Sequence, residues 1–336
     1  MKAEMTKRRA PSGIGRVRLQ APAWQETVQR HQLLLLVICL AVVPILLPFT
    51  SLAILILVFG LFAAAFNVLY GYAGILSLGH AALFGTGAYT CGILVVRFGL
   101  TWPLAVVCGA VAAGLLGVVF AFLSLRVRGV YFAMITLALG QCVFFAAFQA
   151  SSWTGGDNGL RDVVVPPFGV GGLTVNMVDP LVRYYVILLF VALALYFLFR
   201  VLSSPFGLTL EMIRENETRA RSCGIDVVGA KRLAFVISGV VSGLAGALYA
   251  IHLSTVPLET LSLNTSGQVV MMVLLGGMGT FSGPFVGAAV FLVAEHILSD
   301  VVVYWQTIVG LLFISAVLFF PKGIWGSLLA LVRERR

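Results

Sequence analysis

Five neutral polar side chains that lie within long apolar runs are the first candidates for chemistry in this chain. They are Asn67, Ser77, His80, Thr136 and Gln141. Amide, hydroxyl and imidazole groups in such surroundings can line a path for a small zwitterion, or they can form hydrogen bonds between packed helices. Taken one at a time, each side chain fits helix packing better, so the path is a hypothesis.

A second group of candidate residues lies in the charged segment 203–232. Ser204 followed by Pro205 predicts a helix start, and Gly224 predicts a helix end. The charged side chains of this predicted helix are Glu211, Arg214, Glu215, Glu217, Arg219 and Arg221. Paired Glu and Arg side chains suit directional docking onto a soluble protein. A solvated loop with internal ion pairs, such as Glu215 with Arg219, explains the composition about equally well.

Motifs for bond chemistry are absent from the sequence. It contains no G-x-x-x-x-G-K-[ST] phosphate loop and no H-E-x-x-H, C-x-x-C or G-x-S-x-G motif. The 5 cysteines have neither disulfide nor metal-ligand spacing. We therefore predict no catalytic residue, no metal and no cofactor.

The composition indicates which solvent surrounds these residues. Of 336 residues, 60% are hydrophobic and only 10% are charged, and the mean hydropathy is +1.04. A soluble protein is typically about 25% charged, so this chain has too few charges to build a water-facing surface. We predict an all-α polytopic membrane protein.

The apolar runs predict about ten transmembrane segments, since about 20 apolar residues in a helix cross a bilayer. The spans are predicted near residues 32–49, 52–70, 74–96, 103–125, 131–150, 182–202, 233–251, 268–278, 284–299 and 303–320. With an even number of spans, both termini lie on one side of the membrane. That side then carries 19 of the 22 Lys and Arg residues.

The uneven distribution of Lys and Arg predicts the orientation, because cytoplasmic loops carry the excess of these residues. Both termini and segment 203–232 are therefore expected in the cytoplasm. The net charge of +9 is explained by this topology and is not the footprint of a nucleic-acid-binding protein. The opposite loop, residues 151–181, is rich in turn residues. It could cap the outer mouth or serve as a packed connector.

The ten predicted spans divide into two sets of five. An odd number of spans forces the second half into the opposite orientation, which is the condition for a five-plus-five inverted pseudo-repeat. The glycine-rich stretches 79–90 and 274–288 fall in corresponding parts of the two halves. Such stretches point to a translocation path near the membrane midplane, although most of the glycines are expected to serve helix packing.

The distribution of acidic residues bears on the energy source for transport. An ion-driven carrier normally holds a carboxylate deep within a span. The one acid within an apolar run here is Glu295, which stands beside His296 near the end of its run. We expect both side chains to reach the membrane–water interface. Any transport is therefore expected to draw its energy from a partner protein.

Several segments together resemble the permeases of ABC importers for branched-chain amino acids. The similarity extends over roughly residues 33–326 and is closest to the M-type permease. It is carried by GYAGILSLGHAALFGTGAYT (71–90), RVRGVYFAMITLALGQ (126–141), TGGDNGL (154–160), SSPFGLTLEMIRENETRARSCGID (203–226), AFVISGVVSGLAGALYA (234–250), VVMMVLLGGMGTFSGPFVGA (269–288) and PKGIWG (321–326).

The resemblance implies partners as well as a function. Such a permease pairs with an H-type permease, two cytoplasmic ATP-binding subunits and a periplasmic substrate-binding protein, in the bacterial inner membrane. A short cytoplasmic helix with an E-A-A-like sequence and a following glycine docks onto the ATPase. Here that stretch runs from Glu217 through Ala220 to Gly224, with Thr218 and Arg219 in place of small residues.

The sequence therefore predicts a transport subunit rather than an enzyme, with leucine, isoleucine, valine or related amino acids as cargo. The predicted parts are a basic cytoplasmic tail (1–31), a transmembrane domain (32–326) and a second basic tail (327–336). A permease for urea or short-chain amides is the nearest alternative, because those importers share much of the pattern. An ion-coupled carrier or channel, or a membrane subunit without transport, belongs to a different class.

Overall fold

The computed structural model describes residues 23–46, 49–127, 129–163, 168–170, 173–175, 177–301, 304–319 and 323–326. Its longer helices are α1 (Ala23–Leu46), α2 (Thr50–Asn67), α3 (His80–Phe98), α4 (Trp102–Ser124), α5 (Val130–Gln149), α7 (Pro180–Leu202), α10 (Val227–Leu253), α11 (Leu263–Gly276), α12 (Gly283–Val301) and α13 (Trp305–Phe319). The predicted tails 327–336 and 1–31 lie outside these residues, except that α1 already begins at Ala23.

Shorter elements connect the long helices. They are the π-helical turn η1 (Val68–Tyr72), α6 (Ser151–Thr154), η2 (Gly156–Asn158), α8 (Pro205–Glu215), α9 (Glu217–Ser222), η3 (Leu258–Leu261) and strands β1 (Phe168–Val170) and β2 (Leu173–Val175). The strands form an antiparallel hairpin. The segment before the hairpin is attached to the loop after α10, because Leu160 and Val256 exchange two backbone hydrogen bonds.

Six helices among the described residues are long and apolar enough to cross a membrane. They span Thr50–Tyr72, His80–Phe98, Trp102–Ser124, Val130–Gln149, Pro180–Leu202 and Val227–Leu253. Shorter apolar helices occupy Leu33–Pro44, Leu263–Gly276 and Gly283–Ser299. The chain is therefore an α-helical, multi-pass membrane protein. Every predicted span contains one of the longer helices, while the count of ten crossings stays a prediction.

One difference from the predicted spans lies between α2 and α3, next to the predicted path residues. The span predicted at 74–96 begins as a helix only at His80, because η1 extends α2 to Tyr72 and the chain then turns. Gly74 has a φ of +70°, a left-handed conformation that glycine adopts without strain and that ends a helix. An irregular segment, residues 73–79, therefore lies between the two helices.

The centre of the bundle is a close contact between α10 and its neighbours α3 and α4. A Cβ atom at Gly246 of α10 would overlap the backbone carbonyl of Phe84 on α3, and one at Gly87 would overlap the backbone of Gly243. Small residues let these helices approach backbone to backbone, as is usual in membranes. This contact makes α3, α4 and α10 one tightly packed layer.

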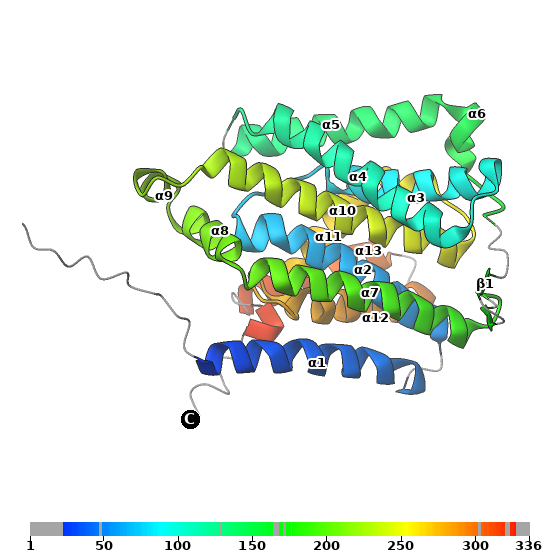
Figure 1. Ribbon diagram of the computed structural model, residues 1–336. Helices are drawn as coiled ribbons and strands as arrows, with labels where there is room; N and C mark the ends of the chain where they lie inside the picture. The colour runs from blue at the N-terminus through cyan, green and yellow to red at the C-terminus, as the bar shows by residue number, and fades with distance from the viewer. Residues whose placement is uncertain are drawn as a thin grey trace, which may run out of the picture.

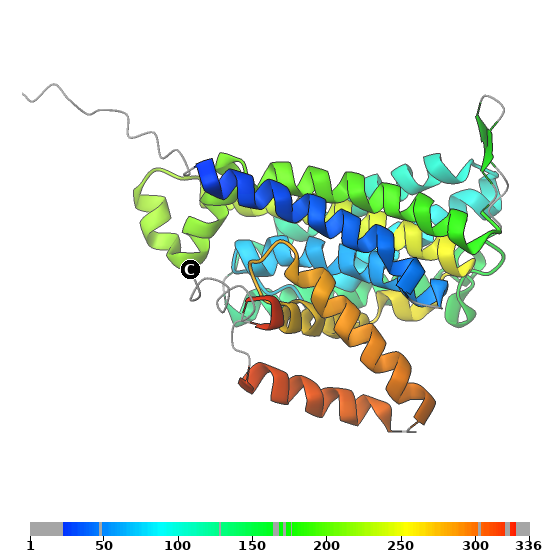
Figure 2. The same ribbon diagram turned by 90° about the horizontal axis from the view of Figure 1, so that it is seen from below.

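The two ends of the bundle carry different structures. Figure 1 shows the start of α1 at the same end as α8 and α9, which project beyond the long helices, and β1 at the opposite end. Figure 2 shows α12 and α13 side by side at one edge of the bundle. We call the two ends the α8–α9 end and the hairpin end.

Candidate functional site

The charged segment 203–232 folds as two short helices rather than the single predicted helix. The start is as predicted, because the Ser204 hydroxyl caps α8 by accepting a hydrogen bond from the Phe206 amide (3.2 Å) with Pro205 in the first turn. The chain then becomes extended at Asn216 (φ −159°). Its side chain accepts from the Arg219 amide (2.9 Å) and so starts α9. Gly224, with φ +83°, follows the end of α9 as predicted.

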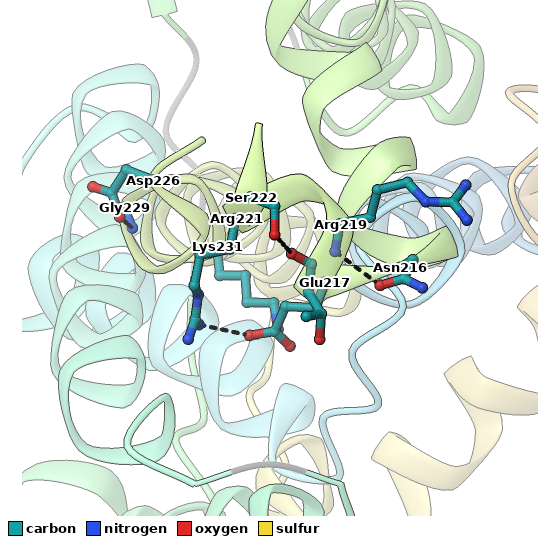
Figure 3. Close-up of polar contacts among 9 residues, drawn as sticks. Asn216, Glu217, Arg219, Arg221, Ser222, Asp226, Gly229 and Lys231 are labelled. Atoms are coloured by element: carbon teal, nitrogen blue, oxygen red, sulfur yellow. Dashed lines mark hydrogen bonds and ion pairs between the residues drawn. The ribbon is translucent and has the colours of Figure 1, made fainter. Parts of the chain in front are cut away.

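Because the helix breaks at Asn216, the ion pairs of this segment differ from the predicted one. Glu217 of α9 pairs with Arg221 (3.1 Å) and with Lys231 of α10 (2.9 Å), as Figure 3 shows. The predicted pair of Glu215 with Arg219 is not among the ion pairs of the described residues, since the two lie on different helices. Glu217 instead ties α9 to the bundle.

A small apolar cluster holds the two short helices against α10. Ile213 of α8, Ala220 of α9 and Val227 of α10 are buried together. Ala220, which the resemblance placed in the docking stretch, therefore packs inward. Glu211, Glu215, Arg219 and Gly224 are exposed, so the charged outer surface of the segment is free to meet another protein. We call residues 205–224 the α8–α9 segment.

Arg214 connects the α8–α9 segment to the break between α2 and α3. Its guanidinium donates a hydrogen bond to the carbonyl oxygen of Gly71 in η1. One turn earlier, the Asn67 side chain donates to the Thr280 carbonyl (2.9 Å) and accepts from the Gly279 amide (3.1 Å). A continuous series of polar contacts therefore runs from α8 through the end of α2 to the turn between α11 and α12.

His80 joins α3 to α10. Its Nε2 lies 2.8 Å from the Ser242 hydroxyl and 3.2 Å from that of Ser238. The Ser238 hydroxyl donates its proton to the Ala65 carbonyl (2.6 Å), so Nε2 must carry the hydrogen in the contact with Ser238. The ring also stacks on Phe62. His80 is thus fully enclosed and bonded to its neighbours.

Thr136 of α5 contacts the segment that carries Ser77. The Thr136 hydroxyl accepts from the Leu78 amide (3.2 Å) and donates to the Ala133 carbonyl (2.9 Å), which fastens segment 73–79 to α5. Ser77 is fully buried, and Gln141 is partly exposed. The path that the five residues were predicted to line stays a prediction.

A cavity of about 880 Å³ lies at the hairpin end, among the start of α2, the end of α10, η3 and α11 to α13. Its polar lining residues include Tyr249, Glu259, Asn264, Gln268, Glu295, His296 and Gln306. None of the five predicted path residues lines it. Glu295 is partly buried and lines this cavity, and its expected position at the membrane–water interface stays a prediction.

Residues 48–320 match the family described as branched-chain amino acid transport system / permease component. The chain belongs to this family. Two relatives have the same name, high-affinity branched-chain amino acid transport system permease protein LivM. The protein from Salmonella typhimurium is 30% identical over 90% of this chain and 77% of its own length. The one from Escherichia coli is 29% identical over 86% of this chain and 74% of its own.

The family membership confirms that the chain is a transport permease rather than an enzyme. No solved structure matches the permease significantly.

Proposed function

We propose that this permease is the M-type membrane subunit of an ATP-driven importer that takes up leucine, isoleucine and valine or related amino acids. The names of the two LivM relatives support the substrate class. The proposed assembly holds an H-type permease, two cytoplasmic ATP-binding subunits and a periplasmic substrate-binding protein, in a bacterial inner membrane.

The proposed orientation places the α8–α9 end in the cytoplasm, together with both termini. Its support is the excess of Lys and Arg in the segments on that side and the position of the start of α1 beside α8 and α9 (Figure 1). The hairpin end then faces the periplasm, where a binding protein delivers substrate.

The observation that carries the proposal is the attachment of the α8–α9 segment. Its exposed face bears Glu211, Glu215 and Arg219, which can form charge-assisted hydrogen bonds with an ATPase. Beside Glu211 on α8, Arg214 bonds to Gly71 where η1 extends α2. A movement of the ATPase that displaces the segment would therefore act directly on the break between α2 and α3.

An inverted repeat is also part of the proposal. The packing of α10 of the second half on α4 of the first has a counterpart in the packing of α2 of the first half on α12 of the second, and the pair α3–α4 corresponds to the pair α11–α12. This pairing relates α2 to α10 and α3 to α11. The two glycine-rich stretches are not equivalent in it, since 79–90 begins α3 whereas 274–288 joins α11 to α12.

Uptake by the assembled importer tests this function. The permease, its three kinds of partner and ATP are combined in proteoliposomes, and uptake of labelled leucine is measured against excess isoleucine, valine, urea or acetamide. We expect ATP-dependent uptake that isoleucine and valine suppress at least tenfold and that urea and acetamide leave unchanged. Suppression by urea would favour the amide importer. Uptake by this chain alone under a proton gradient would overturn the proposal.

A further inference from the structure

The cavity at the hairpin end has a lining of unusual charge for a site within an apolar bundle. Among the described residues that line it are two carboxylates, Glu259 and Glu295, and no Lys or Arg. The two carboxylates come from different elements, η3 and α12, and line the same cavity as Tyr249 of α10. Glu295 is half-buried and Glu259 is exposed, and two carboxylates without a Lys or Arg among the described lining residues favour a cationic ligand.

The other walls are apolar and aromatic. Phe59 of α2, Phe84 of α3 and Tyr249 of α10 form a cluster with ring centroids 5.5–5.8 Å apart. Leu52, Phe291 and other apolar residues continue this surface. A ligand that fits must therefore join a cation to an apolar group, since each part meets a complementary wall.

We propose that this cavity binds an α-amino acid with an apolar side chain, with its ammonium group between Glu259 and Glu295 and its side chain against Phe59 and Phe84. The uncharged amides of Asn264, Gln268 and Gln306 are then left to donate hydrogen bonds to the substrate carboxylate. The inference rests on the proposed function and adds to it a site that the substrate occupies after it leaves the binding protein.

Two glycines allow the cavity to be filled without disturbing its walls. Gly267 of α11 and Gly310 of α13 both line the cavity, and a Cβ atom added at either would meet no atom within 4 Å. Neither requires a left-handed backbone. Gly267→Leu therefore extends a side chain into the space that the ligand would occupy, whereas Gly267→Ala leaves most of that space open.

Binding of labelled leucine to the assembled importer in nanodiscs, without nucleotide or binding protein, tests the site. We expect 3-methylbutylamine, which keeps the ammonium group, to compete with leucine. The deaminated acid 4-methylpentanoate should fail to compete. Glu295→Gln and Glu259→Gln should each weaken leucine binding about tenfold or more, because each removes a charge-assisted hydrogen bond. Gly267→Leu should abolish binding and Gly267→Ala should retain it.

The control is Asp162→Asn, which makes the same change of charge at an exposed position outside the cavity and should leave binding unchanged. Elution of each variant as an intact complex shows that it has folded. Leucine binding that is unaltered by both Gln variants and by Gly267→Leu would overturn the inference. If the wild-type importer still takes up leucine in that case, the proposed function stands and only the cavity site fails. Absence of uptake by the wild type would instead refute the function.

Discussion

The α8–α9 segment and the cavity at the hairpin end hold charge in opposite ways. In the segment, Glu217 is neutralised by Arg221 and Lys231, and exposed residues of both signs cover its surface. In the cavity, Glu259 and Glu295 are accompanied by no Lys or Arg among the lining residues that the structure describes. Mixed, exposed charges suit a folded protein partner, and a one-sign cavity suits a small ion or zwitterion.

The comparison indicates that a conformational change at the α8–α9 end must reach the cavity at the hairpin end through the packed helices between them. Three features lie on that route, namely the close contact of α10 with α3, the bonds of Asn67 and the bond from Arg214 to Gly71. Each can be changed separately from the charges at either end. The following changes run from the largest expected effect to the smallest.

Replacing Gly246 with valine should have the largest effect. The new side chain has no space against the backbone of Phe84, so α10 and α3 cannot keep their contact. We expect the yield of assembled importer, measured by size-exclusion chromatography after membrane extraction, to fall at least tenfold. Gly267→Val, at a position where an added Cβ meets nothing, should assemble normally. Equal yields of the two variants would contradict the importance of this contact.

Reversing the charge of Glu217 should impair coupling without preventing assembly. Glu217→Lys would place a third cation beside Arg221 and Lys231 and so detach α9 from α10. We expect ATP-dependent leucine uptake to fall at least tenfold while the amount of permease in the membrane stays the same. Glu217→Gln, which retains hydrogen-bonding capacity, should lose less uptake. Full uptake by the lysine variant would show that the position of α9 is unimportant.

Removing the Asn67 side chain should have a smaller effect on stability. Asn67→Ala deletes two hydrogen bonds to the turn between α11 and α12 and leaves the Gly279 amide without that partner. We expect a loss of about 1–3 kcal/mol, seen as a lower midpoint of thermal unfolding for the importer in nanodiscs. Asn67→Asp, which keeps the acceptor for Gly279, should lose less. An unchanged midpoint for the alanine variant would argue against this link.

The sequence was sufficient to locate the helices. Each apolar run contains a helix, because length and hydropathy are local properties that a membrane helix needs whatever its neighbours are. The caps at Ser204 and Gly224 were also predictable from residue type. The break at Asn216 carried a signal too, since asparagine is a favoured first residue of a helix. The sequence prediction missed this signal because the charged residues on both sides of Asn216 were assigned to one continuous helix.

The cavity could not be predicted in the same way. Glu295 faces it only because α13 lies beside α12, and Glu259 reaches it from a separate turn. Neither relation is visible in the local sequence. The attachment of Arg214 to Gly71 likewise joins residues that are 143 positions apart. Tertiary contacts of this kind decide which polar residues meet, and none of the five polar residues singled out by their surroundings in the sequence lines the cavity at the hairpin end.

The ratio of leucine uptake to ATP hydrolysis in an Arg214→Ala importer tests the central claim most directly. The change removes the bond to Gly71 and leaves Glu211, Glu215 and Arg219 free to dock. Arg200→Ala, which removes an exposed arginine at the same end, is the matched control and should keep both activities. We predict that ATP hydrolysis by the Arg214 variant stays within about twofold of wild type while leucine uptake falls at least tenfold. The reason is that the substitution lowers the coupling free energy between the ATPase and the permease and leaves the ATPase itself unchanged. An unchanged ratio of uptake to hydrolysis would contradict transmission through Arg214.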